Sequence, residues 1–573
     1  MKTTFFGHQL NREKVLRLLL IAVAAVVSVK YIFVDFGVDA EFQISMAYRM
    51  VAGDAMFTEM WEPYQMSAFL CAFFIKIYLT LFKTTTGIVL YLQTVGVLID
   101  AGISVLLYKI VKKYLHAEKT GFLMAWLFVM ISPKDNPLAD YTNMQMWFAL
   151  LLCIFMFLYY ETKKRRYVIA TALSMCGVVL SYPSCVLLLL GVLFMFFYKK
   201  DYKNALLVIG ICALAGAIYL CFIFVNVTPG GFFEIVRNIL QIETSHSTGL
   251  VERIWLYFKD FIEIIIVLAI LYGISFGVTR FIPAKNEDEI RARGVIADLL
   301  FVLMTVFIGL YTVICWREYV RYCYSIVFLA VIFVGWRMLL RTKMSEEKRY
   351  FYLCGTIISI LQFLATLMLT NLAMIASVPF LLIAVLAALL PIEEGLKGLD
   401  IKKSFLAVKR VAVTFILFAL VFRSVYMIRP MTGYASSICE IASIVKEGPA
   451  IGIISEYMGP YIQNETIKEW KQYIKDGQSI YIVGGELDTL GYLYADTEIA
   501  APSVVPTPGY NEGILKYWEM NPEKYPDVII ASCWYGELCP ELKEGTWIHQ
   551  WINEEYQPAY YIDGKYWRYY FRE

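Results

Sequence analysis

Carboxylates gather in one segment near the N-terminus, just after the first long apolar run of the chain. Arg49 is the only cation within residues 35–66, and the acids there are Asp35, Asp39, Glu41, Asp54, Glu59 and Glu62. Carboxylates beside a membrane can act as general bases or as ligands of a divalent cation. The plainer alternative is that such acids are solvated, or that Asp39 stabilises the start of a helix through the helix dipole.

Two arginines form a second pattern. Arg317 and Arg321 are four residues apart, so on a helix they share one face. Two guanidinium groups on one face suit a phosphate, which arginine binds through two parallel hydrogen bonds. The alternative is that both side chains reach the phosphates of surrounding lipids without a specific ligand. A further polar group separates two other apolar runs and consists of Lys134, Asp135 and Asp140.

Composition places these residues in a membrane protein. Of the 573 residues, 59% are hydrophobic and 17% are charged, and the mean hydropathy is +0.60. Soluble domains are about 45–50% apolar and about 25% charged. The net charge of +2 and the lack of a basic arm with interleaved aromatic residues argue against nucleic acid as a partner.

The apolar runs predict a polytopic α-helical membrane domain over residues 1–430. A spanning helix needs about 20 mostly apolar residues. This criterion predicts about 13 spans, at 18–34, 87–108, 120–133, 143–160, 167–181, 183–198, 205–226, 260–279, 295–315, 322–339, 350–370, 373–391 and 411–427. The acidic residues then lie in a first outer loop, residues 35–86.

The distribution of lysine and arginine orients these spans. If Ser67–Phe82 lies on the membrane surface instead of crossing it, every basic cluster from the N-terminus to Arg410 falls on the cytoplasmic side. Lys76, Thr80 and Lys83 form a polar stripe on that segment, as expected of an interfacial helix. We therefore predict a multi-pass protein of the cell membrane with a cytoplasmic N-terminus and an extracytoplasmic C-terminal domain.

Residues 431–573 predict that C-terminal domain to be a soluble α/β fold. Ser479–Val483 and Val528–Ala531 have the pattern of buried strands, and Glu465–Lys475 has that of a helix. Asp563-Gly564 is a hairpin turn signal between two further short strands.

The order of these features resembles the GT-C superfamily of polyprenyl-phosphate-dependent membrane glycosyltransferases, such as the protein O-mannosyltransferases and the aminoarabinose transferases that act on lipid A. These enzymes have an early span, an outer loop in which an acidic residue opens an amphipathic helix, and then a proline and an interfacial apolar helix. Residues 38–70, VDAEFQISMAYRMVAGDAMFTEMWEPYQMSAFL, are similar. Asp39 takes the place of the catalytic acid. Glu41 is the near substitute, because Ala40 separates two acids that are adjacent in the family.

The resemblance also implies roles for other residues. Asp140, with Lys134 close before it, would help to bind the acceptor or a metal. Arg321-Tyr322 resembles an Arg-Tyr pair near the donor phosphate, and Arg317 would bind the same group. The implied donor is a polyprenyl-phosphate sugar in the membrane, and the acceptor is a glycan, lipid or protein of the cell envelope. No cofactor is required for certain, and a divalent cation remains open.

Two other functions compete with this hexosyltransferase-type activity. A transporter or flippase of lipid-linked glycans, without catalysis, would need ionisable residues near the membrane midplane. The predicted spans contain few of these, chiefly Asp100 and Asp298. A glycan polymerase or ligase would share the lipid-linked donor but not the acidic first loop. Transfer of a sugar on the outer face of the membrane is therefore the favoured prediction.

Overall fold

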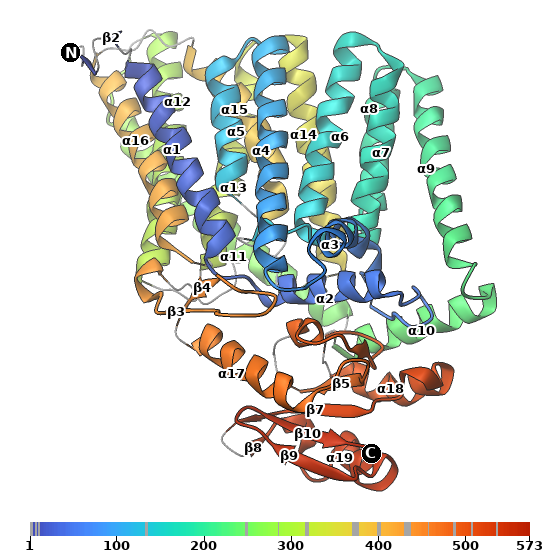
Figure 1. The fold of residues 1–573 in the computed structure, drawn as a ribbon. Helices are drawn as coiled ribbons and strands as arrows, with labels where there is room; N and C mark the ends of the chain where they lie inside the picture. The colour runs from blue at the N-terminus through green and yellow to red at the C-terminus, as the bar shows by residue number, and fades with distance from the viewer. Residues whose placement is uncertain are drawn as a thin grey trace.

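The chain forms a bundle of long helices with a smaller region of helices and strands at one end of it (Figure 1). This computed structural model describes residues 4–5, 8–9, 12–62, 64–131, 136–246, 250–284, 286–315, 320–369, 378–397, 403–428, 437–456, 458–484, 489–505, 508–534 and 537–572. A two-stranded hairpin, β1 (Thr4–Phe5) and β2 (His8–Gln9), precedes the first long helix.

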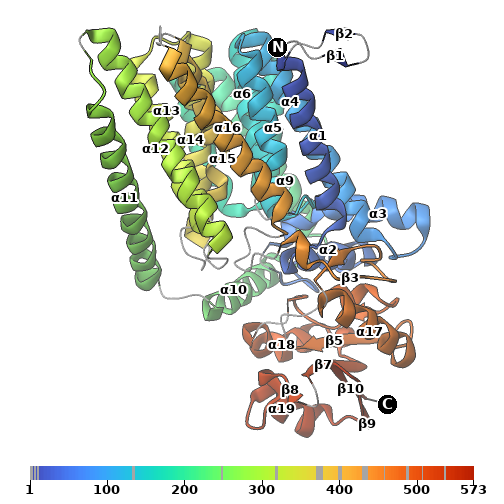
Figure 2. The same ribbon diagram turned by 90° about the vertical axis from the view of Figure 1, so that its left-hand side faces the viewer.

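The bundle helices run side by side (Figure 1, Figure 2). They are α1 (Arg12–Phe33), α4 (Ile88–Tyr114), α5 (Glu118–Met130), α6 (Tyr141–Thr162), α7 (Arg165–Ser181), α8 (Leu188–Tyr198), α9 (Tyr202–Ile223), α11 (Leu250–Arg280), α12 (Glu287–Cys315), α13 (Val320–Arg341), α14 (Glu346–Leu369), α15 (Leu382–Lys397) and α16 (Lys403–Tyr426). Each predicted span overlaps one of these helices, although the bounds differ by several residues at some ends.

Eight helices within the described ranges are long and apolar enough to cross a membrane. Their outer surfaces suit hydrocarbon, since α9 alone exposes Leu206, Leu214 and Ile218 and patches of this kind mark contact with a membrane or a partner. The helices at the predicted spans 167–181 and 183–198 are separated by a break in the backbone. Tyr182 is extended and a 3-10 turn, η2 (Pro183–Leu187), begins at the proline, because the residue before proline disfavours the helical conformation.

Three helices lie across the lower end of the bundle: α2 (Val38–Ala52), α3 (Ala68–Phe82) and α10 (Pro229–His246) (Figure 1, Figure 2). By length and composition alone, Gln65–Phe82 also belongs among the eight apolar helices. In the fold, however, α3 is seen end-on in Figure 1 while the bundle helices run vertically. Its direction therefore fits the interfacial helix expected from the stripe of Lys76, Thr80 and Lys83.

The C-terminal region is built around one mixed sheet. Its elements are β3 (Ser443–Ile444), β4 (Ile454–Ser455), α17 (Met458–Tyr473), β5 (Ser479–Val483), β6 (Glu498–Ile499), α18 (Pro508–Met520), β7 (Val528–Trp534), β8 (Glu537–Leu538), α19 (Trp547–Trp551), β9 (Tyr560–Asp563) and β10 (Trp567–Phe571). The strand order is β6-β5-β7-β10-β9, and β8 pairs with β7. Strands β6, β5 and β7 are parallel, whereas β10 is antiparallel to both β7 and β9.

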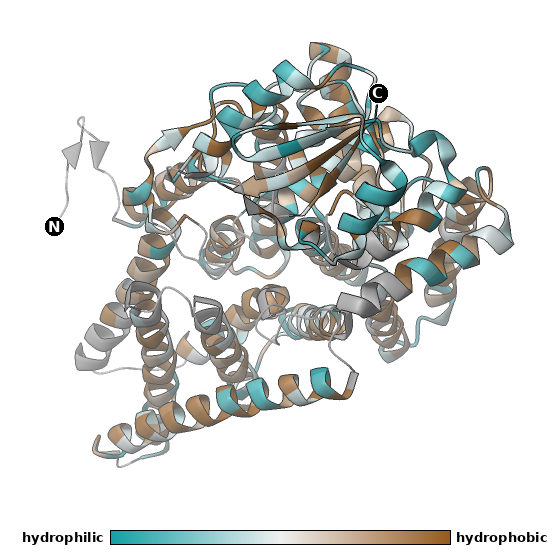
Figure 3. Ribbon diagram, turned by 90° about the horizontal axis from the view of Figure 1, so that it is seen from below, coloured by the Kyte–Doolittle hydropathy of each residue, from teal (hydrophilic) through white to brown (hydrophobic). Residues whose placement is uncertain are grey.

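The predicted elements of this region are present. All five residues of β5 are buried, as a continuous apolar run at the centre of a sheet requires. Asp563 pairs with Arg568 across the expected hairpin. The helix predicted at Glu465–Lys475 begins earlier, at Met458, because a proline such as Pro460 is tolerated in the first turn of a helix. Seen from below, the region covers only one side of the bundle end (Figure 3).

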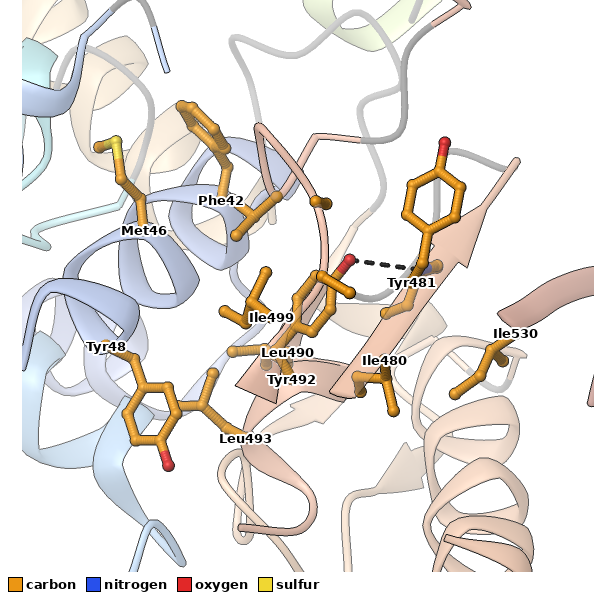
Figure 4. Packing of buried hydrophobic residues seen from close by; sticks show 14 of the residues in the cluster. Phe42, Met46, Tyr48, Ile480, Tyr481, Leu490, Tyr492, Leu493, Ile499 and Ile530 are labelled. Atoms are coloured by element: carbon orange, nitrogen blue, oxygen red, sulfur yellow. Dashed lines mark hydrogen bonds between the residues drawn. The ribbon is translucent and has the colours of Figure 1, made fainter. Parts of the chain in front are cut away.

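Loops of the helical part hold the C-terminal region directly through the backbone. The amide of Asp35 donates to the carbonyl of Ile454 at 2.9 Å, and that of Trp61 donates to Pro502 at 2.8 Å. The Ser45 hydroxyl of α2 donates to the Thr489 carbonyl at 2.6 Å. On the same helix, Phe42, Met46 and Tyr48 belong to one buried apolar cluster with residues of β5, β6 and the turn between them (Figure 4). Helix α2 therefore forms the main contact surface between the helical bundle and the C-terminal region.

We expect the C-terminal region to face outside the cell and the α6–α7 turn to face the cytoplasm. Lys468 on α17 and Lys164 before α7 are both exposed, so a cysteine at either position is accessible to a reagent on its own side. In a background with the exposed Cys221 and Cys439 changed to serine, an impermeant maleimide added to intact cells should label Lys468→Cys and spare Lys164→Cys. Labelling of Lys164→Cys alone would reverse the predicted orientation.

Candidate functional site

Asp39 lies in the first turn of α2, at the lower end of the bundle. Gly37 caps this helix without a side-chain hydrogen bond, and Asp39 and Glu41 are the acids of the first turn. A carboxylate is favoured there by the positive end of the helix dipole. The Asp39 side chain is exposed, although the residues that follow Glu41 on α2 are almost all buried. A ligand can therefore reach this carboxylate from outside the protein.

Asp39 meets the beginning of α6. The hydroxyl of Tyr141, the first residue of α6, hydrogen-bonds to the Asp39 side chain, and the Asp140 carboxylate lies close enough to act on the same phenol. Residues 39 and 141 belong to different loops of the sequence. The fold thus brings the first and second predicted outer loops together, with both Asp39 and Asp140 near the Tyr141 hydroxyl.

Asp140 is the N-cap of α6. Its Oδ1 accepts a hydrogen bond from the backbone amide of Asn143 at 2.7 Å and another from the Thr142 hydroxyl at 2.8 Å. The residue is fully buried. A side-chain oxygen at this position satisfies one of the unpaired amides at a helix start. Asp140 therefore has a clear structural role, which accounts for its position without a ligand.

A close backbone contact sets the loop that carries Asp140. At Gly96 on α4, an added Cβ would lie 1.6 Å from the carbonyl oxygen of Pro137, so only glycine allows the loop to pack this tightly. The side-chain Nδ2 of Asn143 then donates to the backbone carbonyls of Asn136 at 2.5 Å and Leu138 at 2.8 Å. These contacts fix the height of the α6 N-terminus beside α4 and, with it, the position of Tyr141.

Three tyrosine rings stack next to Asp39. The ring centroid of Tyr64 is 5.3 Å from that of Tyr141 and 5.1 Å from that of Tyr182, with interplanar angles of 17° and 15°. Tyr182 is the extended residue at the break between α7 and η2. Stacked aromatic rings hold one another in place through packing and quadrupole interactions. The stack therefore ties the segment before α3 to the same corner of the bundle as α6.

Three of the other acids of the first loop, Asp54, Glu59 and Glu62, form ion pairs away from Asp39. Arg49 of α2 is fully buried and forms ion pairs with Asp54 at 2.7 Å and Glu62 at 2.8 Å. Its Nη2 also donates to the Glu59 carbonyl at 2.8 Å. Lys524 from the C-terminal region pairs with Asp54 at 2.8 Å and with Glu59 at 3.4 Å. These five residues form one charged network, the Arg49 network, between α2 and the C-terminal region.

The electrostatics of the Arg49 network keep its cations charged. Burial lowers the pKa of Arg49, but Glu62 and Asp54 outweigh that effect and raise it well above its ordinary value. Burial likewise opposes the charge of Lys524, and Asp54 raises its pKa overall. For Glu62 the balance is the other way, since burial raises its pKa more than the guanidinium of Arg49 lowers it. The network is thus a paired, water-excluded structural element.

The positions of the remaining predicted site residues relative to Asp39 are not described. Lys134, Asp135 and Arg317 lie outside the described residues, and Arg321 and Tyr322 are in the first turn of α13, where the backbone alone is described. Among the described side chains, no group of three or more His, Cys, Asp and Glu residues could hold a metal ion. Tyr141 and Lys524 are the participants that sequence reasoning missed, because each belongs to its cluster only through the fold.

Replacing Arg49 should destabilise the junction between α2 and the C-terminal region. In Arg49→Met, the buried Glu62 carboxylate loses its ion pair, a change that costs about 3–5 kcal/mol. Thermal unfolding of the purified protein, followed by protease resistance of the C-terminal region, should shift accordingly. Lys471→Met is the matched control, because its ion pair with Glu447 is largely exposed and worth under about 1 kcal/mol. An Arg49→Met protein as stable as the control would contradict a structural role for the network.

The cap at Asp140 gives a second stability prediction. Asp140→Ala should lose about 0.5–2 kcal/mol, whereas Asp140→Asn should remain close to the wild type, since asparagine caps a helix about as well as aspartate. Thermal unfolding of the three proteins side by side distinguishes them. Equal losses in both variants would mean that the negative charge itself is needed, as it would be for a bound divalent cation.

Comparison with known proteins adds no family to this picture. No protein-family model matches the sequence, and no curated protein matches it either. The features that bear on function are therefore the polytopic helical fold and the corner where Asp39, Tyr141 and Asp140 meet.

Proposed function

We propose that the protein transfers a sugar from a polyprenyl-phosphate donor to an acceptor hydroxyl at the outer surface of the membrane, in assembly of a cell-envelope glycan. The proposal rests on one observation above all. Asp39 is an exposed carboxylate at the lower end of a bundle of apolar helices, on a helix that lies across that end (Figure 1). A group in that position can meet a lipid-linked donor from the bilayer and a polar acceptor from water.

Asp39 supplies the base for this reaction. Its carboxylate takes the proton of the acceptor hydroxyl as the acceptor oxygen attacks the anomeric carbon of the sugar. The bond between that carbon and the phosphate oxygen breaks, the electron pair leaves with the polyprenyl phosphate, and the configuration at the anomeric carbon inverts. The Tyr141 hydroxyl orients the carboxylate through its hydrogen bond to Asp39, which holds one of its oxygens in a defined direction.

The leaving phosphate requires positive charge. In this proposal Arg317 and Arg321 supply it, with Tyr322 beside them, because guanidinium groups stabilise the charge that develops on a phosphate oxygen. Asp140 and Lys134 contribute to the acceptor side in this proposal, and a divalent cation is the other ligand that carboxylates there could bind. The C-terminal region, fixed to α2, borders the side from which the acceptor arrives.

Two features of the spans weigh against a carrier without chemistry. Asp100 on α4 accepts a hydrogen bond from the indole of Trp147 at 2.5 Å. Asp298 on α12 pairs with Arg337 of α13 at 2.7 Å. Both acids are thus engaged with neighbouring helices, whereas a proton- or ion-coupled carrier uses intramembrane acids along its path. The two functions separate with the purified protein: incubated with a lipid-linked sugar donor and an acceptor in detergent, a transferase forms a glycosylated product that mass spectrometry detects, whereas a carrier forms none.

Asp39→Asn tests the proposed base. Asparagine keeps the size and hydrogen-bonding ability of the side chain but accepts no proton at neutral pH, so transfer should fall by about 10²–10⁴-fold. The readout is the amount of the missing glycan product restored when the variant is returned to cells that lack the protein. Equal amounts of variant and wild type in the membrane show that folding is preserved.

Glu41→Gln is the matched control for this experiment. Residues two positions apart on a helix are separated by about 200° around its axis. Glu41 therefore points away from Asp39, although both lie in the same turn. Its activity should stay near that of the wild type. If Glu41→Gln abolishes transfer and Asp39→Asn does not, Glu41 is the base. If both variants restore the glycan fully, the first loop holds no catalytic acid, and the proposal fails.

A further inference from the structure

A second polar site lies on the other side of α2. A groove of about 320 Å³ opens between the C-terminal half of α2, the outer face of α3 and a loop of the C-terminal region. Lys76, Thr80 and Lys83 line it from α3, Tyr48 lines it from α2, and Asp496 lines it from the loop before β6. The stripe noted in the sequence thus becomes one wall of a concave surface, which the reaction at Asp39 does not use.

This groove is separate from the proposed catalytic corner. Tyr48 is nine residues after Asp39 on α2, which places it about 14 Å along the axis and two and a half turns around it. The two side chains therefore lie near opposite ends and on opposite faces of one helix. A ligand in the groove would not touch Asp39, and the following inference does not rest on the proposed function.

The charges of the groove favour an anion. Lys76 and Lys83 are exposed, and within the described part of the chain neither ammonium group takes part in an ion pair, whereas Asp496 is the single carboxylate of the lining. Burial and the nearby Asp496 raise the pKa of Tyr48, so its hydroxyl stays protonated and can donate a hydrogen bond. Two ammonium groups and a phenol are donors that a phosphate accepts from.

The surroundings of the groove point to a lipid as the source of that phosphate. On α3, next to the lysines, Phe73, Leu81 and Phe82 are 59%, 68% and 58% exposed. Helix α3 also lies across the ends of the bundle helices (Figure 1, Figure 2). A helix so placed buries its apolar side chains at the acyl-chain boundary and holds its lysines at the level of the headgroups.

We propose that the groove between α2 and α3 binds the phosphate headgroup of an anionic membrane phospholipid, held by Lys76 and Lys83. The lipid thereby fixes α3 against the membrane surface, next to the loop of the C-terminal region that carries Asp496. Asp496 limits the affinity, because its carboxylate repels the phosphate. Its removal should therefore strengthen binding, an effect opposite to that of removing either lysine.

Site-directed photolabelling tests this assignment. The full chain is reconstituted in phosphatidylcholine nanodiscs that contain a small fraction of photoactivatable phosphatidylglycerol, and labelled peptides of α2 and α3 are quantified by mass spectrometry. A lysine near an anionic membrane surface changes binding roughly fivefold, so labelling should fall about fivefold in Lys76→Gln and in Lys83→Gln, and about 25-fold in the double variant. Asp496→Asn should increase it. Lys112→Gln/Lys113→Gln, two exposed lysines at the other end of the bundle, should leave it unchanged.

Three results would overturn the proposal. The first is that the double lysine variant shows the same yield of labelled α2 and α3 peptides as the wild type. The second is equal labelling by photoactivatable phosphatidylcholine, which would show that the headgroup charge is irrelevant. The third is loss of the label when millimolar inorganic phosphate replaces chloride at constant ionic strength, since the groove would then be a site for a soluble anion. Persistence of the label under phosphate supports the lipid.

Discussion

The buried guanidinium of Arg49 is the constraint on which the lower half of the molecule depends. A charge removed from water costs several kcal/mol unless it is paired and hydrogen-bonded, so the segments that carry its partners cannot separate from α2. Those partners come from the loop after α2, through Asp54 and Glu62, and Lys524 extends the same network into the C-terminal region. One cation thus holds a surface helix, a loop and a sheet domain in a single arrangement.

The same constraint positions the proposed catalytic corner. A helix of 15 residues such as α2 is marginal in water by itself and needs tertiary packing. The Arg49 network and the apolar cluster around Phe42 and Met46 provide that packing on the side of the C-terminal region. With α2 fixed there, its first turn projects toward α6, where the Asp140 cap and the contact of Gly96 with Pro137 hold Tyr141 in place. The position of Asp39 is therefore set by contacts that other residues make.

Local sequence patterns predicted the helices and strands of this fold well. They predicted the contacts between residues distant in the sequence poorly. Apolar runs of about 20 residues identify helices, and Asp563-Gly564 identifies a hairpin, because both signals are contained in neighbouring residues. Asp54 pairs with the distant Lys524, and Asp39 hydrogen-bonds to Tyr141. Nothing in the local sequence around Asp39 or Asp54 marks those contacts, which arise only when the loops converge. Likewise, the sequence identified Asp140 only as an acid before a predicted span. Its hydrogen bonds from Thr142 and Asn143 in the structure show that it caps the N-terminus of α6.

Convergence of the loops also divides six acids that look equivalent in the sequence. Asp54 and Glu62 are buried in ion pairs, and Glu59 contributes its carbonyl and its carboxylate to the same network. A carboxylate bound in this way is unavailable to a substrate, since withdrawing it would leave Arg49 or Lys524 uncompensated. Asp39 differs because it is exposed and hydrogen-bonds to the phenol of Tyr141. The ion pairs of Arg49 and Lys524 thus account for Asp54, Glu59 and Glu62. Of the remaining three acids, Asp39 is exposed, whereas Asp35 and Glu41 are half-buried.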